Sequence, residues 1–114
     1  MRCALLDLYG FLGKKWAFVL FSRIDAAPLS YNELQKVSNR LLNPSLLSSR
    51  LKEMVALGIV ERKIEGGRVV YAATPKGSLL KKAMHAVKMW ADDSLPVQCR
   101  GKACVCETAF RPRF

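Results

Sequence analysis

The sequence is poor in the residues on which enzyme and metal sites usually depend. It holds one histidine, His85, and nine acidic side chains among 114 residues. A lone histidine cannot build a catalytic or metal cluster, so we expect His85 at the surface or at a dimer contact. The chain also lacks a glycine-rich phosphate loop, paired carboxylates in an apolar setting and a serine–histidine–aspartate set. These absences predict a protein that is not an enzyme and carries no cofactor. A thiol-dependent enzyme that pairs Cys3 with His85 is a distant alternative.

The sequence also lacks a long uninterrupted hydrophobic run. Residues 3–24 are mostly apolar, but Asp7, Lys14, Lys15 and Arg23 interrupt them. A signal peptide or a membrane-spanning helix would instead be continuously apolar. We therefore expect no membrane partner and a cytoplasmic location.

Acidic residues are few relative to basic ones. The ratio of 19 basic to nine acidic residues gives a net charge of +10 and a pI near 9.9. Such an excess favours a polyanionic partner, above all nucleic acid. A charge that serves only solubility is the alternative. The hydrophobic fraction of 51% is sufficient for a packed core, and the length fits one domain.

Hydrophobic periodicity predicts an α+β chain that is mainly helical. The expected elements are helices 2–12, 14–24, 31–37 and 44–57, strands 59–64 and 68–73, and a final helix 75–91. Ser30 followed by Glu33 is a capping-box pattern, and Gly66-Gly67 is a hairpin turn signal. We expect one winged helix-turn-helix domain over residues 1–95, followed by a basic tail with cysteines over 96–114.

The expected order of a short helix, a turn, a second helix and a hairpin is that of a winged helix-turn-helix. In such a domain the second helix enters the major groove of DNA, and the first braces it across the backbone. The recognition helix is expected at 44–57, with Leu47, Leu51 and Met54 facing inward. The side chains then expected to face DNA are Ser45, Ser48, Ser49 and Lys52.

Further DNA contacts are expected around that helix. Arg50 lies nearer its flank, where it either contacts a phosphate or pairs with Glu53. The hairpin offers Lys63 and Arg68, for which a solvated strand charge is the alternative. Candidate phosphate contacts around the turn are Lys36, Asn39 and Arg40.

Five segments, 12–16, 29–34, 43–54, 57–62 and 71–77, carry a resemblance to a known family, and three of them contain its more specific motifs. These three are Gly13-Lys14-Lys15-Trp16, Asn43-Pro44-Ser45-Leu46-Leu47-Ser48-Ser49-Arg50-Leu51-Lys52-Glu53-Met54 and Tyr71-Ala72-Ala73-Thr74-Pro75-Lys76-Gly77. Over about residues 3–95 the chain resembles the HxlR-type regulators of the MarR-like winged-helix group. The resemblance implies a transcription regulator that binds double-stranded DNA sequence-specifically. An architectural, largely non-specific winged-helix DNA-binding protein is the alternative.

The same resemblance implies a homodimer held by the terminal helices, here about 2–12 and 76–95. The residues agree, since both segments carry more apolar positions than a small core needs. The alternative is that these positions complete the core of the monomer. A dimer would place two recognition helices about one DNA turn apart and would favour a pseudo-palindromic operator.

The four cysteines are Cys3, Cys99, Cys104 and Cys106. Several members of the resembled family sense oxidants through a cysteine before the Gly-Lys-x-Trp motif, in some with a C-terminal cysteine of the other subunit as disulfide partner. The resemblance thus implies a redox role for Cys3 with one of the tail cysteines. A zinc or iron–sulfur site in the tail is a weak alternative, because the spacing is not a recognised metal motif. Inert or structurally bridged thiols are the third interpretation.

Overall fold

The computed structural model describes residues 3–38 and 42–96. The elements are α1 (Ala4–Leu12), α2 (Ala17–Ser22), β1 (Leu29–Ser30), α3 (Tyr31–Val37), α4 (Pro44–Leu57), β2 (Val60–Glu65), β3 (Arg68–Ala73) and α5 (Pro75–Ser94). Helices α3 and α4 and strand β3 have the predicted bounds, and the α+β winged helix-turn-helix is confirmed. The domain boundary at residue 95 stays a prediction, since nearly all of the tail lies outside the described residues.

Local sequence signals determine where three of the helices begin. Ser30 Oγ accepts a hydrogen bond from the Glu33 amide at 3.3 Å, and Glu33 Oε1 accepts one from the Ser30 amide at 2.9 Å. This is the predicted capping box at α3. Asn43 Oδ1 caps α4 by accepting from the Leu46 amide at 2.8 Å, and Thr74 caps α5 in the same way.

The three strands form one antiparallel sheet in the order β1–β3–β2. Gly66 and Gly67 have positive φ angles of 56° and 78°, which a tight two-residue hairpin turn requires. Strand β1 was not expected, because two residues carry no alternating pattern. It pairs with β3 through its backbone, with Leu29 opposite Tyr71.

Helix α2 is the most buried helix and is shorter than the sequence suggests. Leu20 and Phe21 have no exposed surface. The expectation of a helix from residue 14 is wrong, because residues 13–16 form a turn in which Trp16 has a φ of 67°. Trp16 still packs against the core, so its apolar character fits either backbone and does not reveal the turn.

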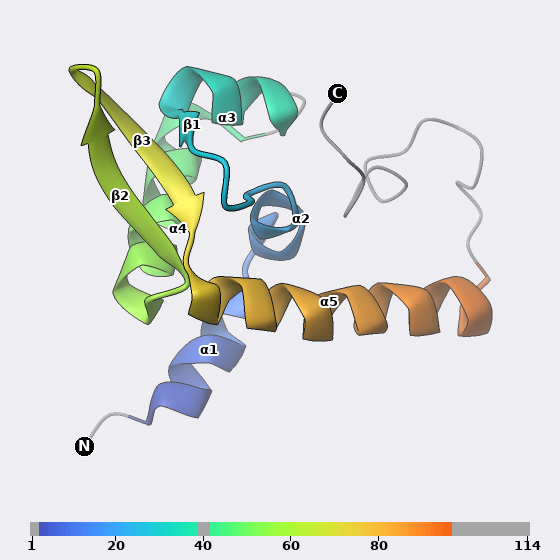
Figure 1. Cartoon of the computed structure of the whole chain (residues 1–114). Helices are drawn as coiled ribbons and strands as arrows, with labels where there is room; N and C mark the ends of the chain where they lie inside the picture. The colour runs from blue at the N-terminus through green and yellow to red at the C-terminus, as the bar shows by residue number, and fades with distance from the viewer. Residues whose placement is uncertain (1–2, 39–41, 97–114) are drawn as a thin grey trace.

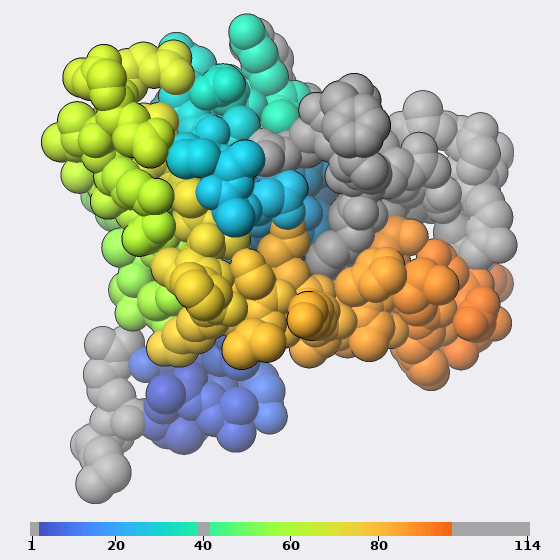
Figure 2. Space-filling view, in the orientation of Figure 1, coloured from blue at the N-terminus to red at the C-terminus, as the bar shows by residue number. Residues whose placement is uncertain are grey.

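Figure 1 shows how the elements divide the molecule. Helix α3 and the tip of the β2–β3 hairpin lie at one end, α1 lies at the opposite end, and α5 projects sideways beyond the other elements. In the space-filling view α1 stands out as a lobe beneath α5 (Figure 2). Helix α5 continues to Ser94, past its expected end at residue 91. Within the described residues, no helix has the length and apolar character needed to cross a membrane.

Candidate nucleic-acid interface

Helices α3 and α4 form the helix-turn-helix and are tied together where each begins. The Tyr31 hydroxyl donates to the Pro44 carbonyl oxygen at 2.9 Å, which joins the first turn of α3 to the first turn of α4. Leu34 and Leu47 are fully buried in the shared core. These contacts fix the two helices to each other and leave the outer face of α4 in solvent.

The outer face of α4 is polar and carries short side chains near its start. Its inward positions are buried as predicted, namely Leu47, Leu51 and Met54. Ser45, Ser49 and Lys52 are exposed, and Ser48 is half-buried. Hydroxyl groups donate or accept at base edges and phosphates, and short side chains permit close approach. This surface suits a helix that lies in the major groove.

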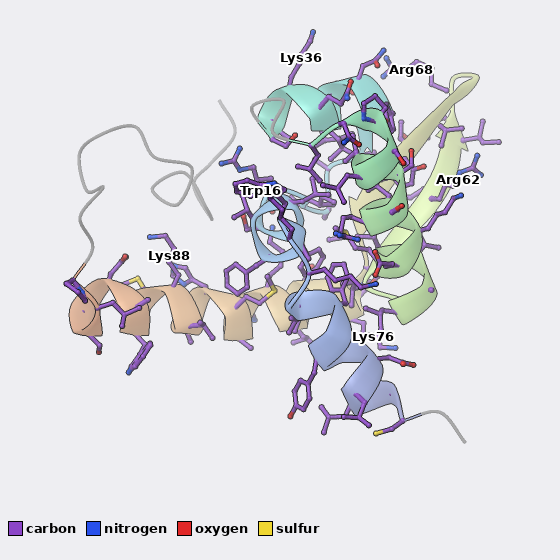
Figure 3. All side chains as sticks on the ribbon, turned by 180° about the vertical axis from the view of Figure 1, so that it is seen from behind. Trp16, Lys36, Arg62, Arg68, Lys76 and Lys88 are labelled. Atoms are coloured by element: carbon purple, nitrogen blue, oxygen red, sulfur yellow. The ribbon has the colours of Figure 1, made fainter. Side chains whose placement is uncertain are left out.

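The hairpin tip and α3 share one edge of the molecule with the start of α4. The Arg68 guanidinium at the tip lies 3.7 Å from the Glu33 carboxylate of α3. Lys36 of α3 is exposed, and Figure 3 shows it at the same end of the molecule as Arg68. We call this surface, formed by Lys36, Ser45, Ser49, Lys52 and Arg68, the polar edge.

The remaining cations of the hairpin point to opposite faces of the sheet. Val60 and Ala73 join the core, and Arg62 lies on their face, which Figure 3 shows beside α4. Lys63 lies on the other face, 3.2 Å from Glu61. Arg62 is exposed, yet sequence reasoning left it out of the DNA-facing set. The alternation of the strand about Val60 was the signal that could have included it.

Arg50 is engaged inside the protein. Its Nη1 donates to Glu53 Oε1 at 2.6 Å, its Nε donates to the Lys15 carbonyl oxygen at 3.1 Å, and its side chain is only 12% exposed. Of the two roles that the sequence left open, the structure shows the pairing with Glu53. Lys14 also pairs with Glu53. Burial alone would raise the pKa of the Glu53 carboxyl, but hydrogen bonds from Lys14 and Arg50, and their charges, hold that pKa below its ordinary value.

Large apolar side chains are exposed on α1 and α5. They are Leu5, Leu6 and Tyr9 on α1, and Leu79, Val87, Met89 and Trp90 on α5. Exposure reaches 60% for Trp90 and 67% for Leu79. Single exposed apolar residues are ordinary, whereas a concentration of them is a common feature of interaction surfaces.

Cys3 is a free, exposed thiol at the N-cap of α1. Five further predicted site residues lie outside the described part of the chain. They are Asn39, Arg40, Cys99, Cys104 and Cys106. Among residues 3–38 and 42–96, no three histidine, cysteine, aspartate or glutamate side chains are grouped so as to hold a metal ion.

The helix pair, the hairpin beside it and the two outer helices define a winged helix-turn-helix protein. The model of the family described as HxlR-like helix-turn-helix matches residues 11–99, and the chain belongs to that family. The resemblance drawn from the sequence motifs is therefore confirmed.

Individual relatives agree with this assignment. The HTH-type transcriptional regulator YodB of Bacillus subtilis (strain 168) is 28% identical over 102 residues, which span 87% of each chain. The reduced form of YodB has a TM-score of 0.72 and 26% identity, covering 84% of this chain and 97% of that one. The quinone-bound form of YodB has a TM-score of 0.69 and 27% identity, covering 82% and 99%. The chain thus belongs to a family of helix-turn-helix transcription regulators, as the sequence predicted.

Proposed function

We propose that this chain is a homodimeric transcription regulator that binds double-stranded DNA sequence-specifically and works in the cytoplasm. The observation that carries the proposal is the polar edge. The Tyr31–Pro44 hydrogen bond and the Glu33–Arg68 ion pair bring α3, the start of α4 and the hairpin tip to one side of the protein. This arrangement suits a helix in the major groove with a basic hairpin on the neighbouring backbone.

The roles of the side chains follow from their positions. Ser45, Ser48 and Ser49 face base edges or phosphates, and Lys52 contributes a cation on the same face of α4. Lys36 and Arg68 contact the backbone on either side of the helix, and Arg62 joins them from β2. Asn39 and Arg40 remain candidate phosphate contacts at the turn, and Lys63 a weaker one, because it lies beside Glu61.

The homodimer is supported by the exposed apolar side chains of α1 and α5. Trp90 and Leu79 would lose most of their exposed area in an interface between two copies, which is the usual reason for such residues to gather. Two copies related by a twofold axis would present two α4 helices to one duplex. The matching operator is a pseudo-palindrome.

A response to thiol oxidation or to electrophiles is supported by Cys3 and by the relatives. Cys3 is free and exposed, and YodB has solved structures of a reduced and of a quinone-bound form. We propose that Cys3 either adds to an electrophile or forms a disulfide with a tail cysteine of the partner subunit. In the second case two thiols lose two protons and two electrons to an oxidant. The candidate partners are Cys99, Cys104 and Cys106.

Fluorescence anisotropy with two duplexes tests the proposed function. One duplex carries the DNA flanking the protein's own coding region and the other is random, and each is titrated with and without thiol reductant. We expect at least about a thousandfold tighter binding to the flanking DNA, and a change in that affinity on oxidation. Specific binding with the same affinity with and without reductant would contradict the proposed thiol response and leave the proposed DNA recognition standing. Equal binding to both duplexes would favour an architectural protein, and no binding would contradict DNA recognition.

A further inference from the structure

The turn between α1 and α2 is attached to the recognition helix by one acidic residue. Lys14 of this turn pairs with Glu53 Oε2, while Arg50 donates to Glu53 Oε1 at 2.6 Å. Arg50 Nε in turn donates to the carbonyl oxygen of Lys15 at 3.1 Å. We call this set, formed by Lys14, the Lys15 carbonyl, Arg50 and Glu53, the Glu53 bridge.

The bridge joins residues that are far apart in sequence and partly shielded from water. Lys14 and Glu53 are 39 positions apart. The side chain of Glu53 is 24% exposed and that of Arg50 12%, whereas that of Lys14 is 48% exposed. Both oxygens of Glu53 are used, and each partner is charged, so the hydrogen bonds are of the stronger, charge-assisted kind. The pair of Arg50 with Glu53 should contribute more than the pair of Lys14 with Glu53, because solvent screens the more exposed Lys14.

The turn that the bridge holds is itself in an uncommon conformation. Trp16 forms the N-cap of α2 and has a φ of 67°, an angle that residues other than glycine rarely adopt. Lys15 Nζ lies 5.9 Å from the centre of the Trp16 ring. Such a backbone conformation persists only where surrounding contacts impose it. The bridge to α4 is one such contact.

Beside the bridge, α1 and α4 are separated by an open groove. Its walls include Leu6 and Gly10 from α1 and Ala56 from α4, and Lys14 and Glu53 also line it. Packing between the two helices is therefore incomplete along the groove. The polar bridge at its edge supplies a directional link that apolar contact there does not.

We propose that Glu53 is a positioning residue, which sets the orientation of α4 relative to α1 and transmits displacement of α1 to the DNA-reading face. This inference rests on the proposed function, because it assigns the regulation of that same surface. Glu53 directly follows Lys52 of the polar edge and lies one helical turn after Ser49. A shift of the turn at residues 13–16 thus reaches these side chains through a single helix.

Because Glu53 is acidic, its removal distinguishes a positioning role from an effect of net charge on DNA binding. Replacing Glu53 by Gln raises the net charge of the protein from +10 to +11. Added positive charge strengthens binding to any DNA. A positioning role predicts the opposite for a specific sequence, since α4 would no longer be held in its reading orientation.

The test compares Glu53→Gln with Asp92→Asn. Asp92 accepts a hydrogen bond at 2.9 Å from Lys88 within α5, so the control also loses one acidic charge and an ion pair with a lysine. The probes are a duplex selected in vitro from random sequence by the wild-type protein, and an unselected duplex. We expect Glu53→Gln to bind the selected duplex about tenfold more weakly than the wild type does, and to bind the unselected duplex equally or slightly more tightly. Asp92→Asn should bind both duplexes at least as tightly as the wild type.

Two further measurements keep the inference falsifiable. Glu53→Asp keeps the charge on a shorter side chain and should restore part of the specificity, whereas a purely electrostatic effect predicts full wild-type behaviour. Amide hydrogen exchange should quicken at residues 13–17 in Glu53→Gln and stay at the wild-type rate there in Asp92→Asn. Unchanged specificity in Glu53→Gln would overturn the inference. If the wild-type protein selects no sequence, the proposed function fails, and exchange at residues 13–17 alone decides whether the bridge holds the turn.

Discussion

The polar edge and the outer helices α1 and α5 expose opposite kinds of side chain. At the polar edge the exposed groups are serine hydroxyls and cations, such as Ser49 and Lys52 on α4. On the outer helices they are apolar, and Trp90 and Leu79 leave more than half of their surface in water. Most of the fully buried side chains belong to α2, α3 and α4. The difference is the one that the proposed function requires, in which the polar edge meets DNA and the outer helices meet a second copy of the chain.

Hydrogen bonds of Thr74, at the start of α5, also connect α5 to α4 and to the hairpin. Thr74 donates its hydroxyl to the Gly58 carbonyl oxygen at 2.7 Å and accepts from the Gly77 amide at 3.0 Å. The Thr74 amide donates to the Ile59 carbonyl oxygen at 3.1 Å. The end of α4 and the base of the hairpin are therefore set directly against the first turn of α5.

Breaking that junction should have the largest effect. A Cβ added at Gly77 would lie 2.0 Å from the Ile59 carbonyl oxygen, which is backbone and cannot rotate away. We expect Gly77→Ala to lower the free energy of unfolding by about 3 kcal/mol or more. Gly10→Ala is the matched control, because a Cβ there meets nothing within 4 Å. The higher helix propensity of alanine should raise the free energy of unfolding by roughly 0.5–1 kcal/mol. Denaturant unfolding measures both variants, and equal stabilities would contradict the prediction.

A negative charge placed on α5 and one placed on the hairpin beside the polar edge should separate dimerisation from DNA binding. Trp90→Glu is expected to weaken dimerisation at least about thirtyfold, because a buried interface would then hold an unpaired carboxylate. Ile64→Glu alters a hairpin side chain that is 70% exposed, and should leave the dimer intact while weakening DNA binding through repulsion. Sedimentation equilibrium and anisotropy together test this. If the wild-type protein is a monomer, or if both variants dimerise equally, the assignment of dimerisation to the outer helices is wrong.

Within the polar edge, single cations should have moderate effects. Lys52→Ala is expected to weaken operator binding about five- to tenfold and, if Lys52 contacts a phosphate, to reduce the salt slope by about one. Lys82→Ala removes an equal charge from the exposed side of α5 and should change binding less. Anisotropy titrations over a range of salt concentrations provide the comparison. Identical losses in both variants would mean that binding follows net charge rather than this surface.

The parts of the fold that are coded locally could be predicted from the sequence. The serine and glutamate of the capping box are three residues apart, and the buried stripe of α4 recurs within each turn, so α3 and α4 were predicted with their observed bounds. The same holds for the hairpin turn at Gly66-Gly67. The expected DNA-facing residues of α4 follow from that stripe, and the structure leaves Ser45, Ser49 and Lys52 exposed.

Contacts between distant segments could not be predicted in this way. Strand β1 exists because its backbone pairs with β3, and two residues leave no periodic signal. The turn that ends at Trp16 occupies the first residues of the helix expected over 14–24, and only contacts with other elements reveal it. The pairing of Arg50 with Glu53 was foreseen as an alternative because the two are one helical turn apart. The contribution of Lys14 was not, since nothing in the sequence brings it to Glu53.

The smallest expected effect concerns acid stability at the Glu53 bridge. Burial acts to raise the pKa of Glu53, but Lys14 and Arg50 together favour the carboxylate and hold that pKa below its ordinary value. The bridge therefore stabilises the fold fully above the ordinary glutamate pKa of about 4.3, and this contribution disappears as the pH falls through the lower folded value.

Near pH 7 we expect Glu53→Gln to be less stable than the wild type by roughly 1 kcal/mol. The gap should shrink on acidification below about pH 4, when the wild-type carboxyl also becomes neutral. Thermal unfolding of both proteins across pH 3–7 measures the gap, and a gap that stays constant would show that the charge of Glu53 does not hold α4 to the turn.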